Sequence, residues 1–86
     1  MRVGRTARFK KAWEELDEAE KGLGRKAIMN LAEDMRYPGL RAKRIKGTAN
    51  LWEARVSRSL RMTFEIEDDL ILLRNIGRHD ETLERP

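Results

Sequence analysis

The sequence predicts an α+β fold, in which an N-terminal αα-hairpin packs on one face of a roughly four-stranded, mostly antiparallel sheet. In the first third of the chain, apolar residues recur every three or four positions, as they do in amphipathic helices. From Leu40 onward they alternate with polar residues, which is the period of a half-buried strand. The chain has 86 residues and 40% of them are hydrophobic, enough for one core, so residues 1–86 are expected to form a single domain.

Two helices are expected before the sheet. Thr6 is a suitable N-cap for the first helix, and Gly22-Leu23-Gly24 is expected to end it, because glycine readily adopts the positive φ of a helix terminus. The second helix is expected from about Arg25 to Arg36, with Pro38-Gly39 ending it. The apolar stripe of the first helix is formed by Phe9, Trp13 and Leu16, and that of the second by Ile28, Leu31, Ala32 and Met35.

Four strands are expected after the helices. Their predicted ranges are about Ala42–Lys46, Leu51–Val56, Leu60–Glu67 and Leu70–Ile76. The last strand is almost entirely apolar, which indicates an interior strand covered by other elements. The tail after Gly77 has no periodicity that assigns it to an element.

The second and third strands form a hairpin whose register can be predicted. Their apolar residues must share the face that the helices cover, and directly opposed residues of a hairpin point the same way. A three-residue turn, Ser57-Arg58-Ser59, meets this condition and sets Arg55 directly opposite Arg61 on the other face. The apolar pairs of this register are Trp52 with Phe64 and Ala54 with Met62.

Arginines directly opposite each other destabilise a sheet by a few tenths to about 1 kcal/mol. One interpretation is that two solvated guanidiniums tolerate the repulsion at little cost. The other is that the face binds an anion, because paired guanidiniums present planar forks of N–H donors that suit phosphate. The second is favoured if some of Lys43, Arg44 and Lys46 lie on the same face.

His79 is the only histidine and follows the fourth predicted strand. A lone histidine near a terminus is usually an ordinary surface residue, but here the strand would bring its imidazole to the edge of the basic face, where it could act as a general acid or base. The sequence has no second histidine and no carboxylate cluster with ligand spacing around it, so neither a metal site nor a cofactor is expected.

The composition limits the partners and the compartment. The net charge of +4 makes a negatively charged partner plausible, whether nucleic acid, ribosome or acidic protein. No apolar run approaches the roughly 20 residues that span a bilayer, so no membrane association is expected. The chain has no cysteine, which fits the reducing cytoplasm expected as its location.

The ordered set of these features resembles the RelE/ParE toxin superfamily of type II toxin–antitoxin systems over nearly the whole chain. The arginine–valine–serine strand, followed six residues after Arg55 by Arg61, is its strongest element. The resemblance also includes Pro38-Gly39-Leu40, the segment Lys43–Gly47, and the aliphatic run that ends in Ile76–Asp80. The resemblance implies a toxin that cuts mRNA in the ribosomal A site without a metal and is bound by a cognate antitoxin, through which alone it would contact operator DNA.

The resemblance also implies roles for single residues. Arg61 would hold the scissile phosphate, Arg55 would be a second phosphate contact, and His79 would protonate the leaving oxygen. Relatives carry basic residues or a glutamate base near Lys43 and Lys46. The residues expected to bind nucleic acid are therefore Lys43, Arg44, Lys46 and Arg58, the last at the tip of the hairpin turn.

The chain departs from the superfamily pattern after His79. Many relatives carry a tyrosine there that stacks on or orients the substrate base, whereas Asp80 or Leu83 stands at the corresponding place in this chain, and its only tyrosine, Tyr37, lies between the helices and the sheet. Two alternatives to an endoribonuclease therefore stay open. One is a ParE-like inhibitor of DNA gyrase without catalysis, and the other is a degenerate toxin that acts mainly in an antitoxin-bound repressor complex.

Overall fold

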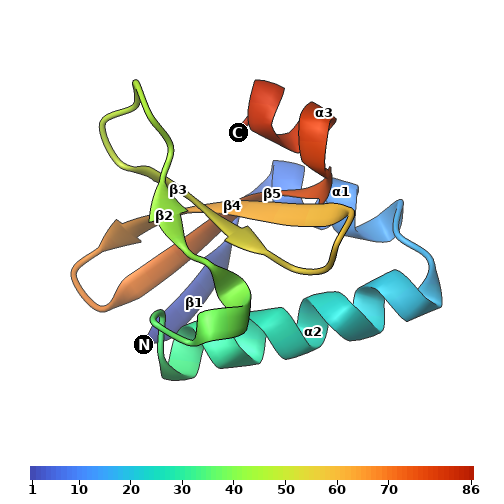
Figure 1. Cartoon of the computed structure of the whole chain (residues 1–86), viewed down its shortest axis with the longest axis horizontal. Coiled ribbons are helices and arrows are strands. Elements are labelled where there is room, and N and C mark those ends of the chain that lie inside the picture. Colours follow the sequence, from blue (N-terminus) through green and yellow to red (C-terminus); the bar gives the residue numbers. More distant parts are fainter.

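A computed structural model describes residues 1–86 and shows helices packed on a five-stranded mixed sheet (Figure 1). The strands are β1 (Arg2–Arg5), β2 (Lys43–Arg44), β3 (Leu51–Arg55), β4 (Leu60–Glu67) and β5 (Leu70–Arg78). The helices are α1 (Ala7–Glu14), α2 (Glu18–Glu33), α3 (His79–Glu84) and the 3₁₀ turn η1 (Pro38–Leu40). The predicted α+β fold class is confirmed. None of the helices has the length and apolar character needed to cross a membrane.

The strand order across the sheet is β1-β5-β4-β3-β2, with β1 parallel to β5 and all other neighbours antiparallel. β1 is the strand that the sequence pattern did not indicate. Its four residues include only one large apolar side chain, Val3, so it has no clear alternation of its own. It exists because it pairs with the apolar first half of β5, from Leu70 to Leu73.

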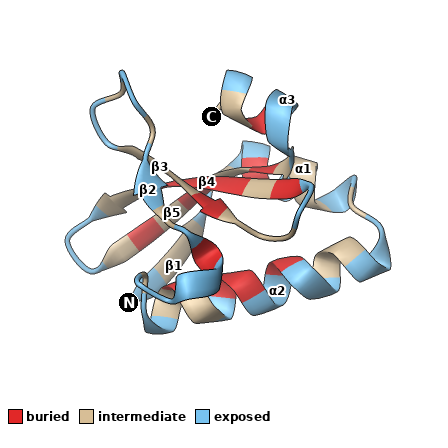
Figure 2. Cartoon of the chain, in the orientation of Figure 1, coloured by how far each residue is buried: buried red, intermediate tan, exposed pale blue.

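The core lies between the sheet and the N-terminal helices. α2 runs along one side of the sheet, and the buried positions of β3, β4, β5 and α2 face one another across this layer (Figures 1 and 2). Its buried residues are Phe9, Ala27, Ile28, Leu31, Leu40, Ala54, Met62, Phe64, Ile71, Leu73 and Ile76. We call the sheet face turned away from α2 the open face.

The predicted boundary between the two helices is wrong. The chain leaves α1 at Glu15 and enters α2 at Glu18, because Asp17 forms a capping box: its side chain accepts from the Glu20 N–H at 2.8 Å, and Glu20 accepts from the Asp17 N–H at 2.9 Å. The two glycines lie inside α2. A Cβ at Gly24 would lie 2.6 Å from the Trp13 ring, so this glycine allows α1 and α2 to pack closely. α2 also ends earlier than predicted, at Glu33.

The predicted hairpin register is confirmed. Trp52 pairs with Phe64, Ala54 with Met62 and Arg55 with Arg61, around a turn at residues 57–59. β4 has its predicted bounds, whereas the predicted first strand shrinks to Lys43–Arg44. A β-bulge interrupts the pairing of β4 with β5 between Thr63 and Phe64, which leaves Arg74 as the extra residue of β5.

The C-terminal segment lies on the open face. β5 continues to Arg78 and α3 follows directly, in the tail that no periodicity assigned. The Thr63 hydroxyl donates to the Pro86 carbonyl at 2.9 Å, and the Asn75 amide donates to the Arg85 carbonyl at 3.0 Å. Figure 1 shows α3 and α2 on opposite sides of the sheet. The C-terminal segment therefore covers the open face over β5 and the middle of β4, whereas β2, β3 and the start of β4 stay uncovered (Figure 1).

Candidate nucleic-acid site

Arg55 and Arg61 lie directly opposite each other on the open face, at the end of the sheet that carries the β3–β4 turn. The turn holds the Arg61 side chain in place: Nη1 donates to the Ser57 carbonyl at 2.7 Å and to the Leu60 carbonyl at 3.0 Å. All internal hydrogen bonds of this guanidinium run through Nη1. The Nε–Nη2 edge is thus free for a bidentate contact with a phosphate.

The electrostatics of the pair favour an anion. Burial of the guanidinium, followed by the positive charge of Arg55, lowers the pKa of Arg61 from its ordinary value. Arg41 acts in the same direction and Glu53 in the opposite one. An arginine stays protonated at any physiological pH, so the repulsion persists in the folded chain and a bound phosphate would relieve it.

Two members of this cluster were not identified from the sequence. Arg41 follows η1 in the left-handed region, at φ 46°, and approaches the cluster from a connection whose course sequence periodicity does not describe. Glu53 is opposite Thr63 on β4 and Lys43 on β2, which puts all three on the open face. The signal for Glu53 was present in the sequence, because it lies two residues before Arg55 in the same strand.

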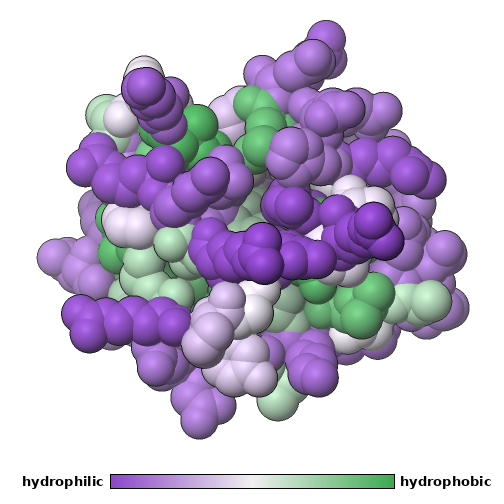
Figure 3. All heavy atoms as spheres, in the orientation of Figure 1, coloured by the Kyte–Doolittle hydropathy of each residue, from purple (hydrophilic) through white to green (hydrophobic).

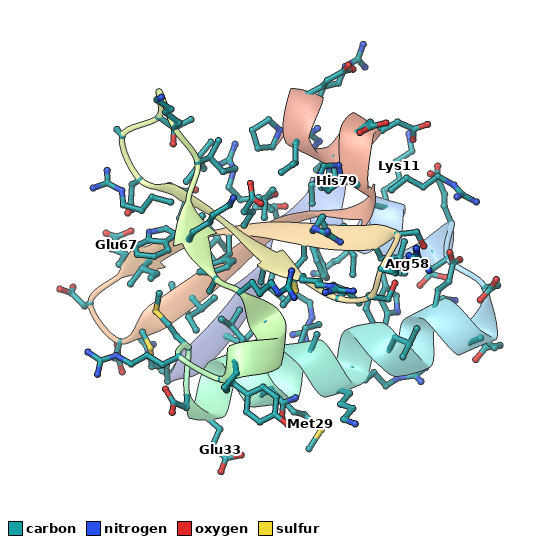
Figure 4. The ribbon with its side chains drawn as sticks, viewed as in Figure 1. Lys11, Met29, Glu33, Arg58, Glu67 and His79 are labelled. Atoms are coloured by element: carbon teal, nitrogen blue, oxygen red, sulfur yellow. The ribbon has the colours of Figure 1, made fainter.

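His79 begins α3 and lies at the same end of the sheet as the arginine pair. Its backbone N–H donates to the Ser59 carbonyl at 3.0 Å, which ties α3 to the β3–β4 turn. Figure 4 shows His79 and Arg58 at this end of the sheet. The imidazole Nδ1 lies 3.1 Å from Asp80 Oδ1, and the side chain is 48% exposed. This leaves Nε2 without a partner in the chain and available for a substrate.

The other predicted basic residues are distributed less uniformly. Lys43 lies on the open face opposite Glu53, whereas Arg44 is opposite Trp52 and therefore belongs to the other face. The Arg44 guanidinium donates to the Ala49 carbonyl in the β2–β3 connection. Lys46 lies in that connection and Arg58 in the β3–β4 turn, both exposed. Lys43 thus joins the cluster, Lys46 and Arg58 lie at its periphery, and Arg44 lies on the other face of the sheet.

The site is therefore a row of side chains on exposed sheet, bordered by α3. Figure 3 shows hydrophilic side chains in a band over β3 and the β3–β4 turn. The row offers two opposed guanidiniums, an imidazole at one end, and a lysine and a carboxylate at the other. Such a set can bind a phosphodiester, stabilise the charge that develops on it, and transfer protons to and from its oxygens.

At the position where the superfamily pattern has a tyrosine, the structure shows no aromatic ring. Asp80 points its carboxylate at the His79 imidazole, and Leu83 is half-buried in α3. A carboxylate next to the ring can orient it through the contact with Nδ1. The local environment of His79 is thus an acid–imidazole pair in place of a stacking platform.

Comparison with solved structures shows a shared fold. The structure is similar to a toxin in the RelB-RelE antitoxin-toxin complex from Methanococcus jannaschii, with a TM-score of 0.78 and 19% identity, covering 98% of this chain and 100% of that one. The YoeB/ParE toxin from Agrobacterium tumefaciens gives a TM-score of 0.78 and 15% identity, covering 92% of this chain and 99% of that one. The intact E. coli RelBE toxin-antitoxin complex gives a TM-score of 0.73 and 15% identity, covering 92% of this chain and 96% of that one.

No protein-family model and no curated protein matches the sequence significantly. At 15–19% identity, the structural likeness establishes that the chain has the RelE-like toxin fold over nearly its whole length.

Proposed function

We propose that the chain is the toxin of a type II toxin–antitoxin pair and that it cuts messenger RNA in the ribosomal A site without a metal. The observation that carries this proposal is the arrangement of Arg55, Arg61 and His79 at one end of an exposed sheet face. The fold is that of proteins whose structures are described as RelE and YoeB/ParE toxins, two of them in complex with an antitoxin.

The cleavage is a transesterification in which the 2′-hydroxyl attacks the adjacent phosphate. Negative charge develops on the phosphoryl oxygens, and preorganised cations stabilise it best, a contribution that is often the largest in catalysis. Arg61 meets this requirement because the turn carbonyls hold its Nη1 and leave its bidentate edge free. Arg55 supplies the second cation, and His79 protonates the leaving oxygen.

The antitoxin is the expected protein partner. The uncovered part of the open face is basic and would attract an acidic antitoxin segment for the same reason that it attracts RNA. Binding there would exclude the substrate. Contact with operator DNA would then come only through the antitoxin.

The experiment is induction of the chain in a bacterial host, comparing wild type with Arg61→Ala and His79→Ala. Wild type is expected to arrest growth and to cut mRNA in a translating extract, and both variants are expected to be silent. Lys26→Ala is the matched control, because it also removes one positive charge but lies exposed on α2, on the other side of the sheet.

Two results would contradict the proposal. Growth arrest with intact mRNA and trapped gyrase–DNA complexes would indicate a ParE-like toxin. A harmless wild type that still binds its antitoxin and represses its operon would indicate a degenerate toxin.

A further inference from the structure

The imidazole of His79 is bound by a single side chain, the carboxylate of the residue that follows it. Nδ1 lies 3.1 Å from Asp80 Oδ1, and neither side chain forms another hydrogen bond or ion pair. An ionised carboxylate has acceptor atoms only, so the ring nitrogen that faces it must be the one that carries a hydrogen. Nδ1 is therefore the N–H of the neutral ring, and Nε2 is the nitrogen that can gain or lose a proton.

The backbone that carries this pair is fixed next to Arg61. Gly77, two residues before His79, is paired directly with Arg61 of β4. A Cβ at Gly77 would lie 2.9 Å from the hydroxyl oxygen of Thr82, which is buried, so the first turn of α3 packs on the backbone of β5. The bond from the His79 N–H to the Ser59 carbonyl adds a second attachment. The start of α3 is thus held beside the arginine pair, and only the rotation of the imidazole is left to be controlled.

We propose that Asp80 is a positioning residue that makes Nε2 of His79 the proton donor of the cleavage; this assignment rests on the proposed function. Asp80 accepts from Nδ1 and so opposes both a turned-over ring and the other tautomer. Nε2 is then the nitrogen that faces away from the carboxylate and is free for the substrate.

The proton transfer that this arrangement serves can be written in full. The imidazolium gives its Nε2 proton to the 5′-oxygen as the bond from that oxygen to phosphorus breaks. The 2′-oxygen forms the new bond to phosphorus, and its proton passes to the surrounding water. The products are a 2′,3′-cyclic phosphate and a 5′-hydroxyl. The ring that remains is the Nδ1–H tautomer, which is the one that Asp80 stabilises, and Nε2 takes up a new proton from water.

The charge and exposure of Asp80 distinguish this role from substrate binding and from stability. A carboxylate repels the phosphates of RNA, so Asp80 gives no attraction to the substrate. Its side chain is exposed and its only bond is to the neighbouring ring, so it contributes little to the fold. Loss of the carboxylate should therefore slow the chemical step and leave both RNA binding and folding unchanged.

The first measurement is the tautomer of the imidazole, which requires no enzymatic activity. His79 is the only histidine, so its ring nitrogens give the only imidazole signals in a nitrogen NMR spectrum of the intact protein. At about pH 9, where an ordinary histidine is neutral, wild type is expected to show a protonated Nδ1 and an unprotonated Nε2. Asp80→Asn should shift the equilibrium toward the Nε2–H form, because an amide can donate to Nδ1 as well as accept from it.

The second measurement is single-turnover cleavage of ribosome-bound mRNA, at a site mapped with wild type. Asp80→Asn is expected to cut about 10–100-fold more slowly, the loss that follows removal of the partner that orients a functional histidine. It should bind as tightly as wild type to ribosomes whose mRNA carries a 2′-deoxynucleotide at the cleavage site. Asp80→Glu keeps the carboxylate and should recover part of the rate and of the Nδ1–H tautomer. Glu84→Gln removes the same charge from an exposed position of α3 and should match wild type throughout.

Four results would overturn the inference. Two concern the ring: a wild type with the Nε2–H tautomer, or an Asp80→Asn variant that keeps the wild-type tautomer. Two concern the reaction: an Asp80→Asn variant that cuts at the wild-type rate, or one that is slow because it binds the ribosome less tightly. The proposed function fails separately, since a wild type that cuts no mRNA removes it, while the tautomer still decides whether Asp80 positions the ring.

Discussion

At the scale of single residues, Arg61 occupies a position that is unfavourable for the stability of the fold. It is partly buried, faces another arginine and forms no ion pair, and its pKa is lowered by that burial and that charge. A side chain selected only for folding would not be placed there. Hydrogen bonds from Nη1 to the turn carbonyls partly offset the repulsion and fix the orientation of the free edge.

Removal of one arginine should therefore make the fold more stable and the protein less active. We expect Arg55→Gln to raise the free energy of unfolding by about 0.2–1 kcal/mol, because it ends the repulsion across the ladder and breaks no internal hydrogen bond. Urea denaturation measures the change, and mRNA cleavage should fall in parallel. Arg58→Gln, exposed in the turn, serves as the stability control and should change little. A less stable Arg55→Gln would show that the pair does not repel.

The sequence predicted the arginine pair correctly but not the full cluster. Strand period and turn length place Arg55 opposite Arg61, and both are local properties. The same period places Glu53 on that face, and the register sets it opposite Lys43 and Thr63. Arg41 joins the cluster from the left-handed residue after η1, a backbone state that no local pattern indicates.

At the scale of elements, the main error of the sequence-based prediction was the boundary between α1 and α2. Glycines are common at helix ends, so Gly22-Leu23-Gly24 appeared to be a stop. The competing signal, Asp17 with Glu20 as a capping box, begins α2 upstream of both glycines. α2 then carries Gly24 to the site where the Trp13 ring packs against it.

The two glycines of α2 should respond in opposite ways to alanine. At Gly22 a Cβ meets nothing within 4 Å, so Gly22→Ala should stabilise the protein by about 0.5–1 kcal/mol, the difference in helix propensity. At Gly24 the Cβ would lie 2.6 Å from the Trp13 ring, so Gly24→Ala should destabilise by about 1–3 kcal/mol, as overpacking does. Urea denaturation of both variants against wild type tests this. Equal effects would show that Trp13 does not pack on α2 at this point.

At the scale of the whole molecule, the chain closes its sheet with its own N-terminal segment. β1 pairs with β5 across almost the full length of the sequence, and Arg2 binds Asp69 in the β4–β5 turn through Nε at 3.1 Å and Nη2 at 3.0 Å. The hydrogen bond from Arg2 lowers the pKa of Asp69 below its ordinary value. Because both side chains are exposed, the contribution is small and sensitive to salt.

The pH dependence of this contact follows from the direction of the shift. A carboxyl whose pKa is lower in the folded state stabilises the fold above its unfolded pKa, about 4, and loses that effect as the pH falls through the folded value. Wild type should therefore be slightly more stable than Asp69→Asn at neutral pH, and the difference should disappear in acid. Urea denaturation of both proteins at about pH 7 and about pH 2 measures it. A difference that persists in acid would assign the effect to packing instead.

The sheet and its hairpin were predictable because their signals are local. Alternation of apolar and polar residues defines β3, β4 and β5, and a three-residue turn leaves one register that buries the apolar sides together. The RelE-like arrangement and the pair Arg55–Arg61 follow from that register.

Three features depended on contacts between segments far apart in the sequence. β1 is a strand because β5 pairs with it, and α1 packs closely on α2 because Gly24 leaves room for the Trp13 ring. The C-terminal segment lies on the open face because Thr63 and Asn75 donate to its last carbonyls. Each segment alone is too short or too polar to show its final state, since such short elements gain their stability from packing rather than from propensity. The same long-range packing brings His79 to the turn between Arg55 and Arg61, and so turns a basic hairpin into a candidate active site.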